Sequence, residues 1–488
     1  MKSVLTKALL LVLCLAMIIP FTACGETTET PDGKGTSANT SAGEAEAETE
    51  NKPFVEKNNY DEEFVAAYCS DIFQKGYFFV DPDNRDEGND LDDKLYEREI
   101  QVEEYLGVEI TALDEGTYTD YTTKFKNSVA SGDDDYQMLM THTYMDVANL
   151  ITGNFLYDMV DMEEHLNLEA DYWNYDLMDD LSINGAMYLG YNDFCLSQVY
   201  VVAFNKTMYE PYQPTMGSLY ELVDNGEWTL DKMAQVAALI DEEGDVDTKK
   251  YGLALHAWVP LISFMAASEI KIVEKDADGE LFVTTNQGKN EKFIALHEKL
   301  YDLCNANYTY CWAPVGNRFS TTTMSLAEGR TLMTITSTFG LVSLKGEDLK
   351  FGVLPYPMYE AKQKSGYQSL NWNGVLACAS SIKNVAMVAD VMEMLAWYTA
   401  PVKTSFYETL LGSKVANAPE DARMLDIIWG SVTSDIGLIF DSSSEFMDRL
   451  LYAIPQQVSL HNNREMASWL RSNSRKAENA LLAMFVEK

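Results

Sequence analysis

The chain has few cationic groups and few histidines. It holds 36 Lys and Arg against 76 Asp and Glu, a formal charge of −40 at pH 7, and only five histidines. A surface this acidic repels nucleic acid phosphates and an anionic membrane face. The composition therefore excludes charge-driven binding to nucleic acid, while 47% apolar residues indicate a globular body.

The sequence also lacks the short motifs of common catalytic sites. It contains no G-x-S-x-G, no H-E-x-x-H, no Walker loop and no dinucleotide-binding glycine fingerprint. With 76 acids, a carboxylate pair for glycoside hydrolysis can always be chosen, so such a pair has little specificity. We expect a protein that is not an enzyme and that needs no cofactor.

Cysteines are scarce and unevenly spaced. After Cys24 only five remain, an odd number without metal-like spacing, which argues against a disulfide framework. Buried free thiols are the expectation, and a single Cys304–Cys311 bridge stays open. The acidic run 241–247 places its glycine too early for an EF-hand, so no metal is predicted, although a structural calcium stays open there.

Residues 25–53 contain no Val, Ile, Leu, Met, Phe, Trp, Tyr or Cys, so they cannot bury enough apolar surface to fold. Before them, a short basic start and an apolar run have the dimensions of a secretory signal. The sequence FTAC that ends at Cys24 resembles a bacterial lipobox. We expect a signal peptide at 1–23, a lipid on Cys24 and a disordered tether to residue 56. A signal peptide with Cys24 as a bystander is the alternative.

Strand and helix patterns alternate along the middle of the chain, which is typical of α/β folds with mainly parallel pairing. Thr229 is a plausible N-cap for a helix, and from about residue 405 helical periodicity dominates. Near the start of the body no strand is obvious, and 77–80 is the nearest candidate. The other expected elements are strands at 136–141, 199–205, 332–336 and 351–354, and a helix through Val388 that ends before Pro401.

Six segments, each weak alone, carry a joint resemblance. They are NGAMYLG at 184–190, VVAFNK at 201–206, DNGEWTLD at 224–231, YGL at 251–253, AEGRTLM at 327–333 and FGVLPYP at 351–357. In this order they resemble the extracellular solute-binding proteins of the maltodextrin-binding type, which serve carbohydrate ABC importers.

The resemblance implies an α/β fold of the periplasmic-binding-protein type II. Two discontinuous lobes would be joined by a hinge, with the first lobe at 57–193 and 334–405 and the second at 194–333 and 406–488. A monomer is expected. Ligands of open α/β sheets usually bind at the carboxyl ends of the strands, which places a cleft between the lobes.

Family positions that match this sequence give candidate ligand contacts. Trp258 and Trp372 are expected on opposite lobes, where relatives stack sugar rings, and Phe339 follows a strand where relatives often place an aromatic residue. Gln198 stands where a relative has a sugar-contacting acid, and Tyr144 lies in a loop after a strand. Trp228, Trp397 and Trp469 are expected in the core, while Trp173 either lines the cleft mouth or packs at the surface.

The resemblance implies a lipid-anchored protein on the outer face of the cytoplasmic membrane. It would capture a sugar or oligosaccharide and deliver it to ABC permease subunits. A surface glycan-active enzyme and a receptor for a peptide or another polar solute on the same fold remain alternatives.

Overall fold

In a computed structural model of the chain, residues 53–69, 78–80, 88–143, 146–195, 199–245, 248–312, 323, 325–344, 348–371, 374–412, 418–440 and 450–485 are described. The predicted signal peptide, Cys24 and the tether up to residue 52 lie outside these residues. The tether was expected to reach residue 56, but Val55 is buried and its carbonyl accepts a hydrogen bond from the Tyr105 hydroxyl at 3.0 Å, so this part of the expectation is wrong. Pro53–Lys488 forms one compact unit.

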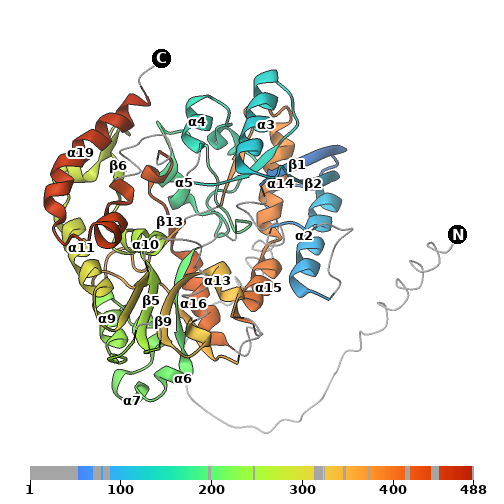
Figure 1. The fold of residues 1–488 in the computed structure, drawn as a ribbon. Helices are drawn as coiled ribbons and strands as arrows, with labels where there is room; N and C mark the ends of the chain where they lie inside the picture. Colours follow the sequence, from blue (N-terminus) through green and yellow to red (C-terminus); the bar gives the residue numbers. More distant parts are fainter. Residues whose placement is uncertain are drawn as a thin grey trace, which may run out of the picture. The chain divides into compact units, whose positions relative to one another are not determined.

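A four-stranded sheet is built from distant parts of the sequence. Its strand order is β12 (Val375–Cys378), β3 (Met138–Thr141), β1 (Glu62–Tyr68) and β2 (Val108–Asp114). Figure 1 shows α2 (Asp90–Leu106) and α14 (Val385–Trp397) beside β1 and β2. Because β12 enters next to β3 from more than two hundred residues later, the lobe around this sheet is discontinuous in sequence.

A five-stranded sheet forms the second lobe. Its order is β10 (Phe351–Leu354), β4 (Tyr200–Asn205), β9 (Thr331–Ser337), β5 (Tyr251–His256) and β8 (Thr309–Trp312). All six residues of β4 and of β5 are buried, as expected for strands covered on both faces.

Helices cover the two sheets and fill the C-terminal part of the chain. The remaining ones are α3 (Tyr118–Ser131), α4 (Val147–Thr152), α5 (Tyr175–Leu181), α6 (Lys206–Tyr209), α7 (Gln213–Met216), α8 (Leu219–Asp224), α9 (Leu230–Ala237), α10 (Val259–Ala267), α11 (Glu291–Cys304), α13 (Thr338–Val342), α15 (Ala400–Leu411), α16 (Pro419–Gly430), α18 (Ala453–Pro455) and α19 (Met466–Ala483). Two small sheets pair β6 (Val273–Lys275) with β7 (Leu281–Val283) and β11 (Ser369–Leu370) with β13 (Val432–Thr433).

Most of the predicted elements are confirmed. The expected strands correspond to β3, β4, β9 and β10, and α14 ends at Trp397, before Pro401. Thr229 caps α9, since its side-chain oxygen accepts a hydrogen bond from the Lys232 amide at 3.2 Å. In α9, Met233, Val236 and Ala237 are buried, a spacing typical of an amphipathic helix.

Two expectations about strands are wrong. The first strand of the body is β1, not 77–80, and the described residues 78–80 form no strand. β1 opens with exposed Glu62 and Glu63, and its apolar part includes Ala66 and Ala67, a residue type that is depleted in strands. The sheets are also mixed rather than mainly parallel, because β12 with β3, β10 with β4 and β4 with β9 pair antiparallel. Hydrophobic periodicity does not reveal pairing direction.

None of the described cysteines forms a disulfide, and Cys69, Cys195 and Cys378 are buried. Cys304 and Cys311 are half-buried and hydrogen-bond each other, which raises the pKa of Cys304. In the described part of the chain no single helix is long and apolar enough to span a membrane. The pair α14 and α15, bent by 51°, passes that test by length and composition only.

Candidate functional site

Trp258 and Phe339 lie at the same edge of the five-stranded sheet. β5 ends at His256 and β9 ends at Ser337, and these two strands pair in parallel. Trp258 caps the start of α10 and Phe339 lies in α13, so each follows its strand directly. Both side chains are half-buried against the core. The structure thus brings two predicted contacts together at the carboxyl ends of the strands, where ligands of such sheets usually bind.

Trp258 stacks on an aromatic residue from the C-terminal part of the chain. Its ring lies 4.8 Å from the ring of Tyr452, centroid to centroid, at an interplanar angle of 20°. Tyr452 is buried and precedes α18, which packs against α10. Stacking on a buried ring holds the indole in one orientation, which prepares it as a platform for a flat ligand face. Tyr452 belongs to no motif, so nothing in the sequence pointed to it as part of the site.

His256 adds a polar group to this edge. It is the last residue of β5 and is buried, and this burial lowers the pKa of its imidazole. The ring is therefore neutral at pH 7 and has both a donor and an acceptor nitrogen. A ligand hydroxyl group both donates and accepts hydrogen bonds, so it can pair with either ring nitrogen.

Three predicted contacts, Tyr144, Gln198 and Trp372, lie outside the described residues. The chain next to Gln198 reaches the same edge, because the Val199 carbonyl accepts a hydrogen bond of 2.8 Å from the amide of Thr338. Thr338 directly precedes Phe339 in α13. Whether the three contact a ligand stays a prediction.

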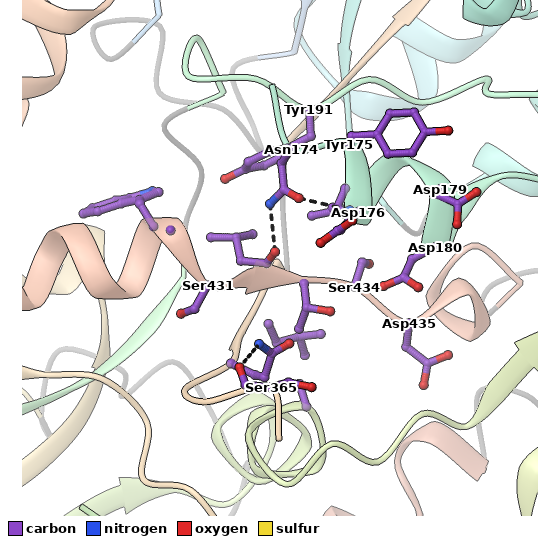
Figure 2. Close-up of a pocket in the computed structure, with 18 of the residues that line it drawn as sticks. Asn174, Tyr175, Asp176, Asp179, Asp180, Tyr191, Ser365, Ser431, Ser434 and Asp435 are labelled. Carbon is purple, nitrogen blue, oxygen red and sulfur yellow. Dashed lines mark hydrogen bonds between the residues drawn. The ribbon is translucent and has the colours of Figure 1, made fainter. Parts of the chain in front are cut away.

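A second feature is a cavity of about 1280 Å³ (Figure 2). Its walls come from 168–193, from the C-terminal half of α10 with 269–275, from 365–370, and from the end of α16 with 429–438. The 168–193 wall is tied to the first sheet, since Gly190 and Leu376 exchange backbone hydrogen bonds of 2.8 Å. The cavity therefore lies between elements of both lobes. Neither Trp258 nor Phe339 lines it.

Ten carboxyl groups and three lysines line this cavity. Lys271 pairs with Asp180 at 2.5 Å, and Lys403 lies 3.3 Å from Asp193. The third, Lys275, donates to the Ser182 hydroxyl at 2.6 Å. All three lysines therefore have hydrogen-bond or ion-pair partners. Lys271 and Lys275 connect the end of α5 to the region of β6 and β7 in the second lobe.

Asp435 is a buried carboxyl group of the cavity, and its pKa is strongly shifted. Burial raises its pKa to about 6, although its oxygens accept hydrogen bonds from the amides of Gly437 at 2.8 Å and of Val273 at 3.3 Å. A third amide, that of Ile272, also donates to it. These bonds fasten the segment after β13 to the start of β6.

Among the tryptophans, Trp228 is fully buried and donates to the Pro355 carbonyl at 3.0 Å, so its core assignment is confirmed. Trp397 and Trp469 are half-buried and pack against the core, as predicted. Trp173 is buried and lines the cavity, and its Nε1 donates to Glu393 at 2.7 Å.

No group of three or more His, Cys, Asp or Glu side chains that could hold a metal ion occurs among the described residues. In the acidic run 241–247, Asp241 accepts a hydrogen bond from Asn307 at 2.6 Å, and residues 246 and 247 lie outside the described part.

Comparison with known proteins defines the class. Residues 100–404 match the family of bacterial extracellular solute-binding proteins, and the chain belongs to this family. A search of curated protein sequences found no significant match. Family membership places the protein outside the cytoplasm, and its relatives are binding proteins rather than enzymes.

Solved structures of low sequence identity share the fold. A Rhizobium etli sugar transporter in an open conformation has a TM-score of 0.56 and 14% identity, and the match covers 86% of this chain and 99% of that one. A Listeria monocytogenes ABC substrate-binding protein in complex with cycloalternan has a TM-score of 0.53 and 13% identity, over 86% and 99%. UgpB from Mycobacterium tuberculosis, in complex with glycerophosphocholine, has a TM-score of 0.53 and 14% identity, over 82% and 97%. The fold is the two-lobed α/β fold of these proteins.

Proposed function

We propose that this protein captures a sugar or oligosaccharide in a cleft between its lobes and delivers it to an ABC permease. The observation that carries the proposal is the Trp258 platform, stacked on Tyr452 at the strand-end edge that also holds Phe339. A sugar ring has a flat apolar face and a rim of hydroxyls, which aromatic rings and a neutral imidazole such as His256 satisfy. The proteins of similar fold named above include one bound to cycloalternan.

On the opposite wall we place Trp372, with Tyr144 and Gln198 in reach of the ligand. We also propose that the second lobe retains residues 331–354, because β9 and β10 pair with β4. The crossing back to the first lobe then falls between β10 and β12, later than the boundary at 333 and 334 expected from the sequence.

Attachment to the membrane completes the proposal. A lipid on Cys24, following removal of 1–23, would hold the protein on the outer face of the cytoplasmic membrane as a monomer beside its permease. Residues 25–53, which contain no large apolar residue, would leave the body able to reach that partner.

A binding panel tests this function. The full chain is titrated with mono- and oligosaccharides, glycerophosphocholine and short peptides, and its thermal unfolding is followed. A ligand that binds only the folded form adds about 2.7 kcal/mol of stability at a hundredfold excess over its dissociation constant. We expect at least one saccharide to raise the unfolding temperature by several degrees. If only peptides raise the unfolding temperature, the ligand is a peptide and not a sugar.

The same samples separate a receptor from a glycan-active enzyme. After prolonged incubation, chromatography of the bound saccharide should return it intact. Release of shorter sugars at a rate proportional to protein concentration would contradict the binding function.

A further inference from the structure

Two cysteine thiols lie side by side in the second lobe. Cys304 is the last residue of α11, and Cys311 lies in β8. Their side chains hydrogen-bond each other, so the two sulfur atoms are close enough for a small side-chain rotation to join them. Both residues are partly exposed to solvent, whereas every other described cysteine is buried.

A tight turn between α11 and β8 explains why the two thiols meet. The amide of Thr309 donates to the Ala306 carbonyl at 3.0 Å, which closes a four-residue turn. Cys304 lies two residues before this turn, and Cys311 lies two residues after it. The chain therefore reverses direction between the two cysteines, and α11 packs against β8. The contact of the thiols depends on local chain geometry and not on a distant segment.

The compartment of the protein favours oxidation of this pair. Members of the family are extracellular. Disulfides form and persist in oxidising environments outside the cytoplasm, while cytosolic thiols are kept reduced. We propose that Cys304 and Cys311, which the structure shows as adjacent thiols, are joined by a disulfide in the exported protein. The bond does not depend on which ligand the protein binds.

The bond forms by exchange with a disulfide oxidant. The hydrogen bond to Cys311, together with burial, raises the pKa of Cys304, so the Cys311 thiolate attacks the oxidant first. The resulting mixed disulfide removes that hydrogen bond, and Cys304 then attacks the sulfur of Cys311. Two S–H bonds break and one S–S bond forms. The two electrons and two protons pass to the oxidant, which leaves as two thiols.

The buried cysteines do not compete for the oxidant. Burial raises the pKa of Cys195 and of Cys378 to about 12, so both thiols keep their protons and are poor nucleophiles. The Cys378 thiol instead donates to the sulfur of Met392 at 3.3 Å. Among the described cysteines, oxidation is therefore specific to the pair at 304 and 311.

The disulfide fastens an edge strand. β8 is the outermost strand of the five-stranded sheet, and among the described strands β5 is its only neighbour. In their register Trp312 stands beside His256, so β8 ends at the sheet edge where Trp258 lies. An edge strand leaves one side of its backbone unpaired. The bond to α11 holds this strand from its other end, and closing a short loop also restricts the unfolded chain, which stabilises the fold.

Peptide mapping tests the bond directly. The full chain is exported from a bacterial host, and whole cells are alkylated with iodoacetamide in denaturant without reductant before trypsin digestion. Cleavage after Lys299 and Arg318 gives one peptide that contains both cysteines. We expect this peptide to carry no alkyl group and to be lighter than its dithiol form by two hydrogen atoms. After reduction it should take up two alkyl groups. The peptides with Cys195 and Cys378 should be alkylated without reduction.

Urea unfolding of the full chain tests the effect on the fold. Reduction should lower the urea midpoint of the wild type, because the loop at β8 is no longer closed. The double variant Cys304→Ser and Cys311→Ser is the matched control, and reduction should leave its midpoint unchanged. In a mixture of glutathione and glutathione disulfide, the reduced wild type should regain the intramolecular bond, whereas Cys311→Ser alone cannot form it.

Three results would overturn the proposal. They are two alkyl groups on the 300–318 peptide of the exported protein without reduction, a glutathione on each of the two cysteines after the exchange, and equal urea midpoints of the oxidised and reduced wild type.

Discussion

Glu393 should be among the costliest side chains to truncate, because three donors from one segment converge on it. It is fully buried in α14. Its Oε2 accepts from Trp173 Nε1 at 2.7 Å and from the Asn167 amide at 3.2 Å, and its Oε1 accepts from the Tyr172 hydroxyl. Tyr172 and Trp173 both line the cavity, so Glu393 holds one wall of it to the first lobe.

In Glu393→Ala, the buried Trp173 donor loses its partner, which costs about 1–3 kcal/mol. The half-buried Tyr172 and Asn167 groups regain water and add roughly 1 kcal/mol, and lost packing adds about 1–2 kcal/mol. Release of a buried carboxylate offsets part of this cost. We expect a net loss of about 3 kcal/mol.

Glu393→Gln separates the hydrogen bonds from the charge. Its carbonyl oxygen can serve Trp173 and Asn167, and its NH2 can donate to the Tyr172 oxygen, so we expect a loss of about 1 kcal/mol or less. Burial raises the pKa of Glu393. The folded protein therefore binds this proton more tightly than the unfolded chain, and stability from Glu393 increases as pH falls through the raised pKa. The Gln variant lacks that increase.

The assay is urea unfolding of the wild type and both variants, followed by tryptophan fluorescence. Glu97→Gln, a change in an exposed helical pair with Lys94, is the control and should stay within about 0.5 kcal/mol of wild type. If Glu393→Ala costs no more than Glu97→Gln, the converging hydrogen bonds do not hold the 167–173 segment, and the reasoning is refuted.

Two further predictions concern a histidine and the anchor. His297 is buried and its Nε2 lies 2.8 Å from the Asn463 carbonyl, and burial lowers the pKa of its ring. Since the unfolded chain then takes up the proton more readily, the contribution of His297 to stability should fall as pH drops from about 7.5 to 5.5. His297→Leu should flatten this dependence, and an unchanged slope would contradict it. Cys24→Ser should abolish lipid labelling and release the protein from membranes on fractionation. A variant that stays in the membrane fraction like wild type would rule out the lipid anchor.

The parts of the fold that could be predicted carry local signals. β4 and β10 are short apolar runs bounded by polar or proline residues, and Thr229 caps α9 through its own side chain. β1 was missed because it opens with two exposed glutamates and contains two alanines, both residue types that are depleted in strands. The pairing direction of β12 depends on a partner far away in the sequence.

The same distinction holds for the candidate site. Trp258 and Phe339 could be placed at one sheet edge because each directly follows a recognisable strand. Tyr452 reaches Trp258 only through tertiary packing of α18 on α10. The cavity combines segments as distant as Asn192 and Ser434, and no spacing within either segment signals that the two meet.

The central claim is that a saccharide stacks on Trp258 at the strand-end edge. The most direct measurement is the dissociation constant, by calorimetry, of the saccharide that binds the wild type best, repeated for Trp258→Ala and for the half-buried Trp397→Ala. An aromatic anchor is commonly worth ~2 kcal/mol or more, so Trp258→Ala should weaken binding more than tenfold. Trp397→Ala should lower stability and keep the affinity. Wild-type affinity in folded Trp258→Ala would contradict the account.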